Sequence, residues 1–564
     1  MRLPRASGIL LHPTSLPGKF GVGDLGPSSR RFIDFLADTG QAWWQILPLG
    51  PTGFGNSPYQ SHSSFAGNPT LISPELLIED GFLDRRDLEA YPTLPADAVD
   101  FDAASAAKER LFRIAFERLS GNHPELEAFR EANAVWIEDY SLFMALKHAH
   151  QERSWIDWEP ELAARKPEAL RVWREKLDFE VRYVQFVQFL FDRQWNRLRA
   201  LCGSKGIKLI GDLPIFVAQD SADVWANPEL FELDQFGRPK VVAGVPPDYF
   251  SESGQLWGNP LYRWAQHAAE GYAWWIKRVK ATINRVDLAR LDHFRGFEAY
   301  WEVPAGESTA RLGSWRPGPA DKLLGALDRA LEGLPLIAED LGDITPEVEA
   351  LRDRFKLPGM RILQFAFGDD AKANDYLPLR HIPHCVVYTG THDNDTTFGW
   401  YHGSEGMTTQ SETIKRAERS YVRRYCGSDG SAIQWDMIRL ALGSVADTTI
   451  IPLQDVLGLG SEARMNIPGR GEGNWTWRYR EEMLDDSVRD RLAELTAVFH
   501  RWNGPIPDRF RIFPDHSKQS VLVDDELQQQ QPPSARNDLS LNDQIENAVQ
   551  LPADQPSTRN LELS

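Results

Sequence analysis

Short apolar segments recur along the chain, and each is followed by polar residues, glycine or aspartate. Runs of this length and composition predict buried β-strands. The segments between them place apolar residues at helical spacing, as in residues 29–39 and 264–282. Eight strands that alternate with helices predict an α/β fold, a parallel (β/α)8 TIM barrel. The predicted strands are residues 8–11, 44–48, 207–213, 286–292, 336–340, 360–365, 386–391 and 448–454.

Two parts of the chain depart from this alternation. Residues 76–199 are too long for a simple crossover and are rich in Glu, Arg, Leu and Trp at helical spacing, which predicts a mostly helical insertion. Residues 503–564 contain a run of four glutamines and show little apolar periodicity, which predicts a disordered C-terminal tail. We therefore expect one catalytic barrel domain over residues 1–502, followed by this tail.

The composition restricts the partners that the chain can bind. The sequence has 564 residues, of which 42% are hydrophobic, and its formal net charge is −19. An acidic surface argues against a nucleic-acid partner and an anionic substrate, whereas a neutral sugar polymer remains compatible. No apolar run approaches the roughly 20 residues that a membrane span requires. The first residues lack the apolar core of a signal peptide, so we expect a cytoplasmic protein without a membrane partner.

Cysteine and tryptophan usage add two constraints. Three cysteines lie far apart, with neither the pairing of a disulfide framework nor the spacing of a zinc site. The 19 tryptophans exceed ordinary usage. Core packing would explain them, but the complete burial of an indole is costly because its N–H needs a hydrogen-bond partner. Sugar-stacking platforms are the other explanation. The clusters that fit both explanations are Trp43–Trp44, Trp274–Trp275 and Trp475–Trp477.

Ionisable residues gather at the predicted carboxyl ends of the strands. In a (β/α)8 barrel the catalytic groups come from these ends. A charge at the end of a buried strand is costly unless it is paired or used, and four such ends in one ring are difficult to explain as structure alone. The four ends read Gly211-Asp212, Arg290-Leu291-Asp292-His293, Glu339-Asp340 and His392-Asp393.

Arg290, Asp292 and Glu339 indicate a pair of catalytic carboxyl groups. Arg290 and Asp292 are two residues apart, so on a strand they point to the same face, where the guanidinium would hold the carboxylate ionised as a nucleophile requires. A plain buried ion pair is the alternative. Glu339, close to other carboxylates, should resist ionisation, which suits a general acid. Asp340 would face away and is interpreted as structural.

His392 and Asp393 admit two interpretations. Asp393 could bind sugar hydroxyls and stabilise an oxocarbenium-like charge, with His392 donating to a neighbouring hydroxyl. A metal site is the alternative, but it would want a His-x-His motif at the end of the first strand. The only such motif, His148 to His150, lies in the predicted helical insertion. We therefore expect no metal.

Several long motifs occur in a fixed order. They read SGILLHPTSLP (residues 7–17), GNSPYQS (55–61), GDLPIFVA (211–218), GVPPDYF (244–250), RLDHFRG (290–296), AEDLG (338–342) and TGTHDN (389–394). Together they resemble the 4-α-glucanotransferases called amylomaltases or disproportionating enzymes, glycoside hydrolase family 77, which are relatives of the α-amylases. The resemblance extends to about residue 502, nearly the whole chain outside the tail.

The resemblance implies an activity and a set of site residues. Such enzymes act on maltooligosaccharides and other α-1,4-glucans, transfer the released segment to another sugar, and need no organic cofactor. By position, Asp292 is similar to the family's nucleophile, Glu339 to its acid/base and Asp393 to its transition-state-stabilising carboxylate. The residues that resemble the family's other sugar contacts are Arg290, His392, Asp212, Ser57, Tyr59 and Asn466.

Residues 244–258 are expected to form an active-site loop that favours transfer over hydrolysis. A transferase must bind a sugar acceptor and exclude water, and this segment carries aromatic rings together with two candidate hinges, Gly244 and Gly254. An ordinary packed loop is the alternative. A rival function is an α-glucan hydrolase of the amylase type, and a non-catalytic glucan-binding barrel would not need all three carboxylates. The loop residues expected to contact substrate are Asp248, Tyr249, Phe250 and Trp257.

Overall fold

The computed structural model describes residues 2–119, 123–247, 253–369, 371–403 and 412–512. Residues 1–512 form one compact unit, which extends past the expected boundary at residue 502. Asn503, just beyond that boundary, donates hydrogen bonds to the carbonyls of Gly40 and Gly206. The rest of the predicted tail, residues 513–564, lies outside the described residues. Within the described ranges, no helix is long and apolar enough to cross a bilayer.

Eight parallel strands in the described chain form a barrel: β1 (Ala6–Leu10), β2 (Trp43–Gln45), β3 (Lys208–Leu213), β6 (Leu288–Leu291), β9 (Leu336–Ala338), β10 (Gly359–Ile362), β11 (Cys385–Tyr388) and β12 (Thr448–Pro452). Their order in the sheet is β10-β11-β12-β1-β2-β3-β6-β9. Ala338 of β9 donates a backbone hydrogen bond to Pro358, just before β10, so the two ends of the sheet meet. All eight predicted strands are present, which confirms the predicted (β/α)8 fold.

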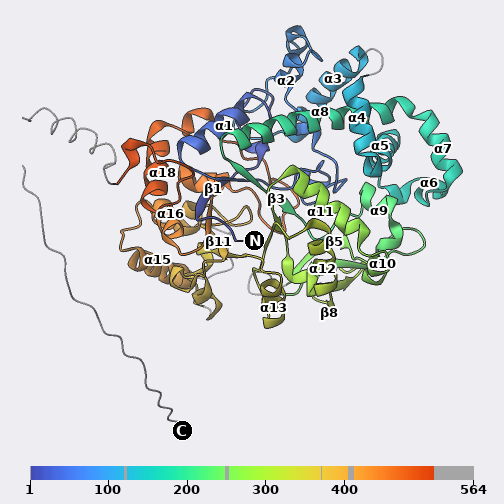
Figure 1. The fold of residues 1–564 in the computed structure, drawn as a ribbon. Coiled ribbons are helices and arrows are strands. Elements are labelled where there is room, and N and C mark those ends of the chain that lie inside the picture. Colours follow the sequence, from blue (N-terminus) through green and yellow to red (C-terminus); the bar gives the residue numbers. More distant parts are fainter. Residues whose placement is uncertain (1, 120–122, 248–252, 370, 404–411, 513–564) are drawn as a thin grey trace, which may run out of the picture. The chain divides into compact units, whose positions relative to one another are not determined.

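Helices surround this barrel (Figure 1). The connection from β10 to β11 is made of 3-10 turns in its described part, whereas the other connections contain α-helix. The predicted helix at 264–282 is divided in two, because Gly271 and Tyr272 both have left-handed φ values of 65° and 61°. The helices beside the strands are α1 (Pro27–Asp38), α9 (Ala222–Ala226), α10 (Trp264–Ala269), α11 (Ala273–Arg285), α12 (Ala320–Leu331), α13 (Pro346–Arg354), α14 (Thr397–His402), α15 (Glu412–Cys426), α16 (Ile433–Gly443), α17 (Leu453–Leu457) and α18 (Asp486–Val498).

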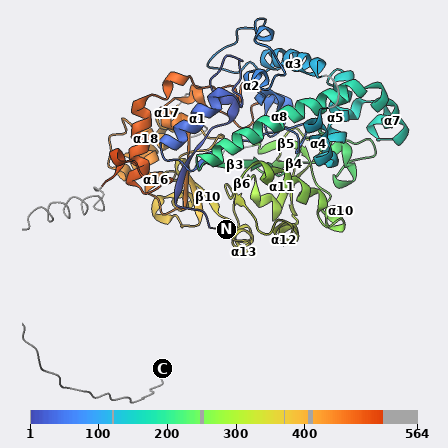
Figure 2. The same cartoon turned by 45° about the horizontal axis from the view of Figure 1, so that its top comes forward.

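The connection between β2 and β3 contains the mostly helical insertion. Figures 1 and 2 show its helices gathered on one side of the barrel, with the long α8 running from that group back towards β3. Two glutamines of α8 form side-chain hydrogen bonds with the backbone of the segment that follows β2, Gln188 with Gly67 and Gln194 with Ser73. These bonds fix α8 against the barrel. The helices are α2 (Pro74–Glu79), α3 (Phe101–Arg118), α4 (Pro124–Ala132), α5 (Ala134–Ala149), α6 (Pro160–Ala163), α7 (Pro167–Lys176) and α8 (Asp178–Ser204).

A second, antiparallel sheet has the order β5-β4-β7-β8, with strands β4 (Val241–Val245), β5 (Gln255–Pro260), β7 (Ala299–Pro304) and β8 (Ser314–Pro317). The segment expected as a loop, residues 244–258, therefore begins within β4 and ends within β5, and these described ends pair as antiparallel strands. Gly244, a candidate hinge, is instead paired on both sides, with Leu256 of β5 and Trp301 of β7. This sheet lies in the connections on either side of β6, the strand that carries Arg290.

Four clustered tryptophans belong to the core. Trp43, Trp44, Trp274 and Trp275 are all buried, and Trp44 and Trp275 have no exposed surface. Core packing is therefore the explanation for these two pairs. Trp475 is also buried, but its ring lies beside the candidate site described next.

Candidate active site

The side chains at the ends of β3 and β6 form an ion-paired group. Asp212 and Arg290 are register partners in these neighbouring strands. Nη1 of Arg290 donates to both carboxylate oxygens of Asp212, at 2.8 and 2.7 Å, and Nη2 donates to Oδ1 of Asp292 at 2.7 Å. Arg290 and Asp212 are buried, whereas the side chain of Asp292 is 25% exposed. One buried guanidinium therefore fixes two carboxylates, of which Asp292 is the accessible one.

Asp212 is held from two directions. Besides Arg290, the hydroxyl of Tyr59 donates to its Oδ2 at 2.8 Å. Burial raises the pKa of Asp212, and the adjacent guanidinium opposes that shift. Because the arginine keeps its charge at ordinary pH, at least one buried anion must accompany it. Arg290 and Tyr59 together fix Asp212 in place, whereas Asp292, bound by Arg290 alone in this group, keeps part of its side chain exposed.

Glu339 lies at the end of β9, next to the Asp292–His293 peptide. Its Oε2 accepts from the His293 amide at 2.7 Å, and its Oε1 accepts from the Leu341 amide at 3.1 Å. Burial raises the pKa of Glu339 to about 8; Arg290 opposes this and Asp292 adds to it. Glu339 is therefore a carboxylic acid at neutral pH, as a proton donor requires.

Asp340, the next residue, has a different environment. Its Oδ1 accepts from the Met360 amide at 2.6 Å, and its Oδ2 accepts from Arg352 at 2.5 Å and Arg361 at 3.4 Å. These contacts join β9 to β10 and α13. The expected structural role of Asp340 agrees with this arrangement, since its oxygens are occupied away from Asp292.

Tyr59 and His392 form an aromatic wall beside the carboxylates. Their rings stack with centroids 5.2 Å apart and an interplanar angle of 14°. Trp475 contacts both rings, at 5.9 and 6.0 Å. Ser57 accepts a hydrogen bond from the Tyr59 amide at 3.2 Å and so shapes the loop that presents the tyrosine. Burial lowers the pKa of His392, which keeps the imidazole neutral.

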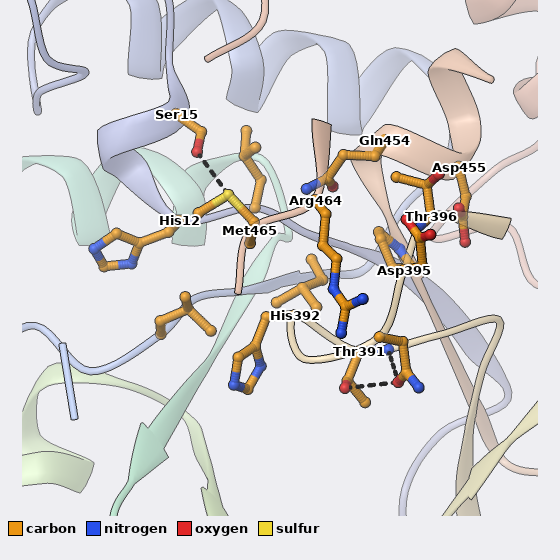
Figure 3. Close-up of a pocket in the computed structure, with 15 residues that line it drawn as sticks. His12, Ser15, Thr391, His392, Asp395, Thr396, Gln454, Asp455, Arg464 and Met465 are labelled. Carbon is orange, nitrogen blue, oxygen red and sulfur yellow. Dashed lines mark hydrogen bonds between the residues drawn. The ribbon is translucent and has the colours of Figure 1, made fainter. Parts of the chain in front are cut away.

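Asp393 lies next to this wall and is 43% exposed. Its Oδ1 is 3.3 Å from Nε2 of His392 and accepts a hydrogen bond of 2.6 Å from the Asn466 amide group. Arg464 donates to the backbone carbonyl of Asp393 at 2.6 Å. Figure 3 shows the hollow beside His392 that Arg464 and Met465 also line. Arg464 was missed from sequence, because no local pattern links it to Asp393.

The hairpin of β4 and β5 contributes one aromatic residue to the described part of the site. Trp257 of β5 meets the His293 ring edge-on, with centroids 4.8 Å apart. Its indole N–H donates to Gln255. The ring is half-buried, and the residue that it contacts, His293, is next to Asp292 in the chain. The other three expected contacts of this loop, Asp248, Tyr249 and Phe250, lie outside the described residues.

The metal alternative finds no support in the described part of the chain. No group of three or more His, Cys, Asp or Glu side chains there is arranged to hold a metal ion. His148 and His150, at the end of α5, pair instead with Glu152 and Glu159, at 3.9 and 2.8 Å.

The chain is similar to known proteins of one family. The family model described as 4-alpha-glucanotransferase matches residues 11–484. The 4-alpha-glucanotransferase of Thermus thermophilus is 51% identical over 514 residues, which cover 89% of this chain and 100% of the relative. That of Synechocystis sp. is 51% identical over 505 residues, covering 88% of this chain and 98% of the relative. The solved amylomaltase from Streptococcus agalactiae in complex with acarbose has a TM-score of 0.84 at 36% identity, covering 88% of this chain and 100% of that chain. The chain therefore belongs to the 4-alpha-glucanotransferase family.

Proposed function

We propose that the protein is a 4-α-glucanotransferase that moves segments of α-1,4-glucans between maltooligosaccharides or starch-like chains by a retaining double displacement. The observation that carries this proposal is the contrast between two neighbouring carboxyl groups. Asp292 is partly exposed and bonded to Arg290, whereas Glu339 is buried with a pKa raised to about 8. Such a contrast divides the roles of nucleophile and acid.

In the first half-reaction, Asp292 attacks the anomeric carbon and Glu339 gives its proton to the glycosidic oxygen. The bond between that carbon and that oxygen breaks, the shortened glucan leaves as an alcohol, and the retained segment is esterified to Asp292 in the β configuration. Asp393 stabilises the positive charge that develops on the sugar ring. Tyr59 supplies an aromatic surface beside it, and His392 supplies a ring N–H as a hydrogen-bond donor.

In the second half-reaction, Glu339 acts as a base. Its carboxylate removes the proton from the 4-hydroxyl of an acceptor sugar, which attacks the anomeric carbon and releases Asp292. The second inversion restores the α linkage. No oxidant, reductant or organic cofactor enters this balance.

Preference for a sugar acceptor over water requires a shielded site. Trp257 packs edge-on against His293, the residue after the proposed nucleophile, and it belongs to the β4–β5 hairpin. Asp248, Tyr249 and Phe250 lie between these two strands in the sequence. We assign this hairpin to acceptor binding and water exclusion. An amylase-type hydrolase would need the same carboxylates, so the product pattern must separate the two activities.

Incubation with maltotriose alone tests the proposal. Transfer yields glucose together with oligomers longer than the substrate, whereas hydrolysis yields only shorter sugars. Asp292→Asn should abolish both products, and Asp486→Asn, which changes an aspartate with a 93% exposed side chain on α18, should leave them unaltered. Glucose and maltose as the only products would contradict the transferase assignment.

The covalent intermediate can be tested separately. Glu339→Gln should accept α-maltosyl fluoride, because fluoride departs without a proton, but it should turn over slowly because the base is missing. Mass spectrometry of the digested variant should find the maltosyl group on the peptide that contains Asp292. A sugar on another peptide would assign the nucleophile elsewhere.

A further inference from the structure

The loops that follow β11 and β12 are joined at Asp393. The amide N–H of Asn466 donates to the His392 carbonyl at 3.1 Å, and its side-chain amide donates to Oδ1 of Asp393 at 2.6 Å. Nη2 of Arg464 donates to the carbonyl of Asp393 at 2.6 Å. Three hydrogen bonds therefore run from one loop to two consecutive residues of the other.

Arg464 also binds its own loop. Its Nε donates to the carbonyl of Asn466 at 2.8 Å, so a single guanidinium holds one carbonyl from each loop. The guanidinium is planar and its donors have a fixed fork geometry, which sets the distance between the two carbonyls. Figure 3 shows Arg464 extending from the segment of Met465 towards the loop of Thr391 and His392. A lysine has one nitrogen on a flexible stem, so it cannot present two separate nitrogens to the two carbonyls in this fixed geometry.

The loop after β12 is also fixed on its far side. Met465 accepts a backbone hydrogen bond from Trp475 at 2.7 Å, and its sulfur accepts one from the Ser15 hydroxyl at 3.6 Å. Trp475 has a left-handed φ of 66°, a strained conformation outside glycine that persists only where its surroundings enforce it. The bridge thus rests on a firmly held segment rather than on a free loop.

We propose that Arg464 is a positioning residue for Asp393. By joining the two loops it sets the direction from which the Asp393 carboxylate reaches the sugar, and it acts through Asp393 rather than on the reacting atoms. Asn466 keeps that carboxylate in place before the sugar binds, in addition to the sugar contact expected of it. This inference rests on the proposed function, because that function assigns Asp393 to charge stabilisation in the transition state.

Kinetics with α-maltosyl fluoride as donor and maltose as acceptor test the role of Arg464. A small misplacement of a catalytic group costs on the order of 100-fold, so Arg464→Gln should lower kcat by about that factor. KM should stay within about twofold, because an interaction made only in the transition state affects kcat. Arg464→Lys should be intermediate, and added guanidinium should partly restore Arg464→Ala. A Gln variant with normal kcat, or with only a raised KM, would overturn the proposal.

Arg470→Gln is the matched control, because Arg470 lies on the same loop but is exposed. It should keep the kcat of the unaltered enzyme. Melting temperatures separate positioning from folding: we expect the Gln and Lys variants to stay folded at the assay temperature while kcat differs between them. Equal kcat for Arg464→Lys and the unaltered enzyme would show that a charge alone suffices and would refute the bridge.

A double-mutant cycle decides whether Arg464 acts through Asp393. In an Asp393→Asn background, Arg464→Gln should lower kcat by less than about threefold, since the group that it positions is already absent. Full multiplication of the two effects would contradict the inference. Failure of the unaltered enzyme to lengthen maltotriose would instead contradict the proposed function, so the two failures can be told apart.

Discussion

At the scale of single residues, Arg290 determines what the neighbouring carboxylates can do. It is 4% exposed and divides its donors between Asp212 and Asp292. Burial raises the pKa of the nearby Glu339 to about 8, and the adjacent Asp292 adds to this shift while Arg290 opposes it. In the proposed mechanism, burial is thus the main reason why Glu339 retains the proton needed for the first step.

Arg290→Lys tests this arrangement. A lysine has one nitrogen and cannot span both carboxylates, so the nucleophile should lose its orientation while the positive charge is kept. We expect kcat/KM for maltotriose to fall on the order of 100-fold or more. Arg263→Lys is the control, because Arg263 makes a long, exposed pair of 3.9 Å with Glu232 and one contact to a backbone carbonyl. Unchanged kcat/KM in Arg290→Lys would refute the orienting role.

The pKa of Glu339 predicts the alkaline limit of activity. The acid must be protonated in the free enzyme, so kcat/KM for maltotriose should be constant through neutral pH and decline above about pH 8. The direction follows from the shift: a raised pKa keeps the proton to higher pH. With α-maltosyl fluoride, whose leaving group needs no proton, this decline should disappear. A decline near pH 5, or the same decline with both donors, would show that Glu339 is not the acid.

At the scale of elements, the hairpin of β4 and β5 places Trp257 against His293, the residue that follows the proposed nucleophile in the chain. Removal of this ring should admit water, so Trp257→Ala should raise the ratio of hydrolysis to transfer severalfold, while Trp257→Phe should keep most of the shielding. Phe236→Ala, which alters a 65% exposed ring at another turn, is the control. Chromatography of maltotriose products measures the ratio. An unaltered ratio in Trp257→Ala would remove the hairpin from the mechanism.

The sequence predicts the barrel strands because each is short, buried and apolar, a pattern that survives without tertiary context. It does not predict the second sheet. All four residues of β8 are exposed, so that strand has no buried face and therefore no alternation of apolar and polar positions to detect. The broken helix at Tyr272 was missed for a related reason: helical periodicity continues on both sides of the left-handed turn.

The residues of the candidate site also divide into those that the sequence predicts and those that it does not. Asp292, Glu339 and Asp393 follow strands of one barrel, so their proximity could be predicted from topology alone. Arg464 and Trp475 belong to the segment after β12, and their contacts with Asp393 and His392 join parts of the chain about 70 residues or more apart. No local pattern encodes such contacts. Only the folded arrangement of the two loops brings them into the site.

At the scale of the whole molecule, Arg501 ties the end of the barrel unit to its beginning. The arginine is buried and donates five hydrogen bonds to backbone carbonyls. Burial lowers its pKa to about 9, because the charged guanidinium loses its solvation at this site. The accepting carbonyls belong to Ala6 of β1, Leu442 of α16, and Ser444, Ala446 and Asp447 before β12. Through these five hydrogen bonds, Arg501 joins the chain segments at the first and last strands of the barrel.

Two truncated chains test whether the compact unit is complete at Ile512 and whether Arg501 stabilises it. A chain that ends after Ile512 retains the complete compact unit, so its melting temperature and its kcat/KM for maltotriose should match those of the full chain. A buried carbonyl that is left without any donor costs about 1–3 kcal/mol. A chain that ends after Phe499 lacks Arg501 and so takes one donor from each of five carbonyls, of which Asp447 keeps the Ala6 amide and Ser444 keeps Arg5 as donors. Its melting temperature should fall by several degrees, and Arg501→Gln in the full chain should show the same direction of change. A full chain with Arg501→Gln that melts like the unaltered protein would show that these hydrogen bonds contribute little, and loss of activity after truncation at Ile512 would place a required element among residues 513–564.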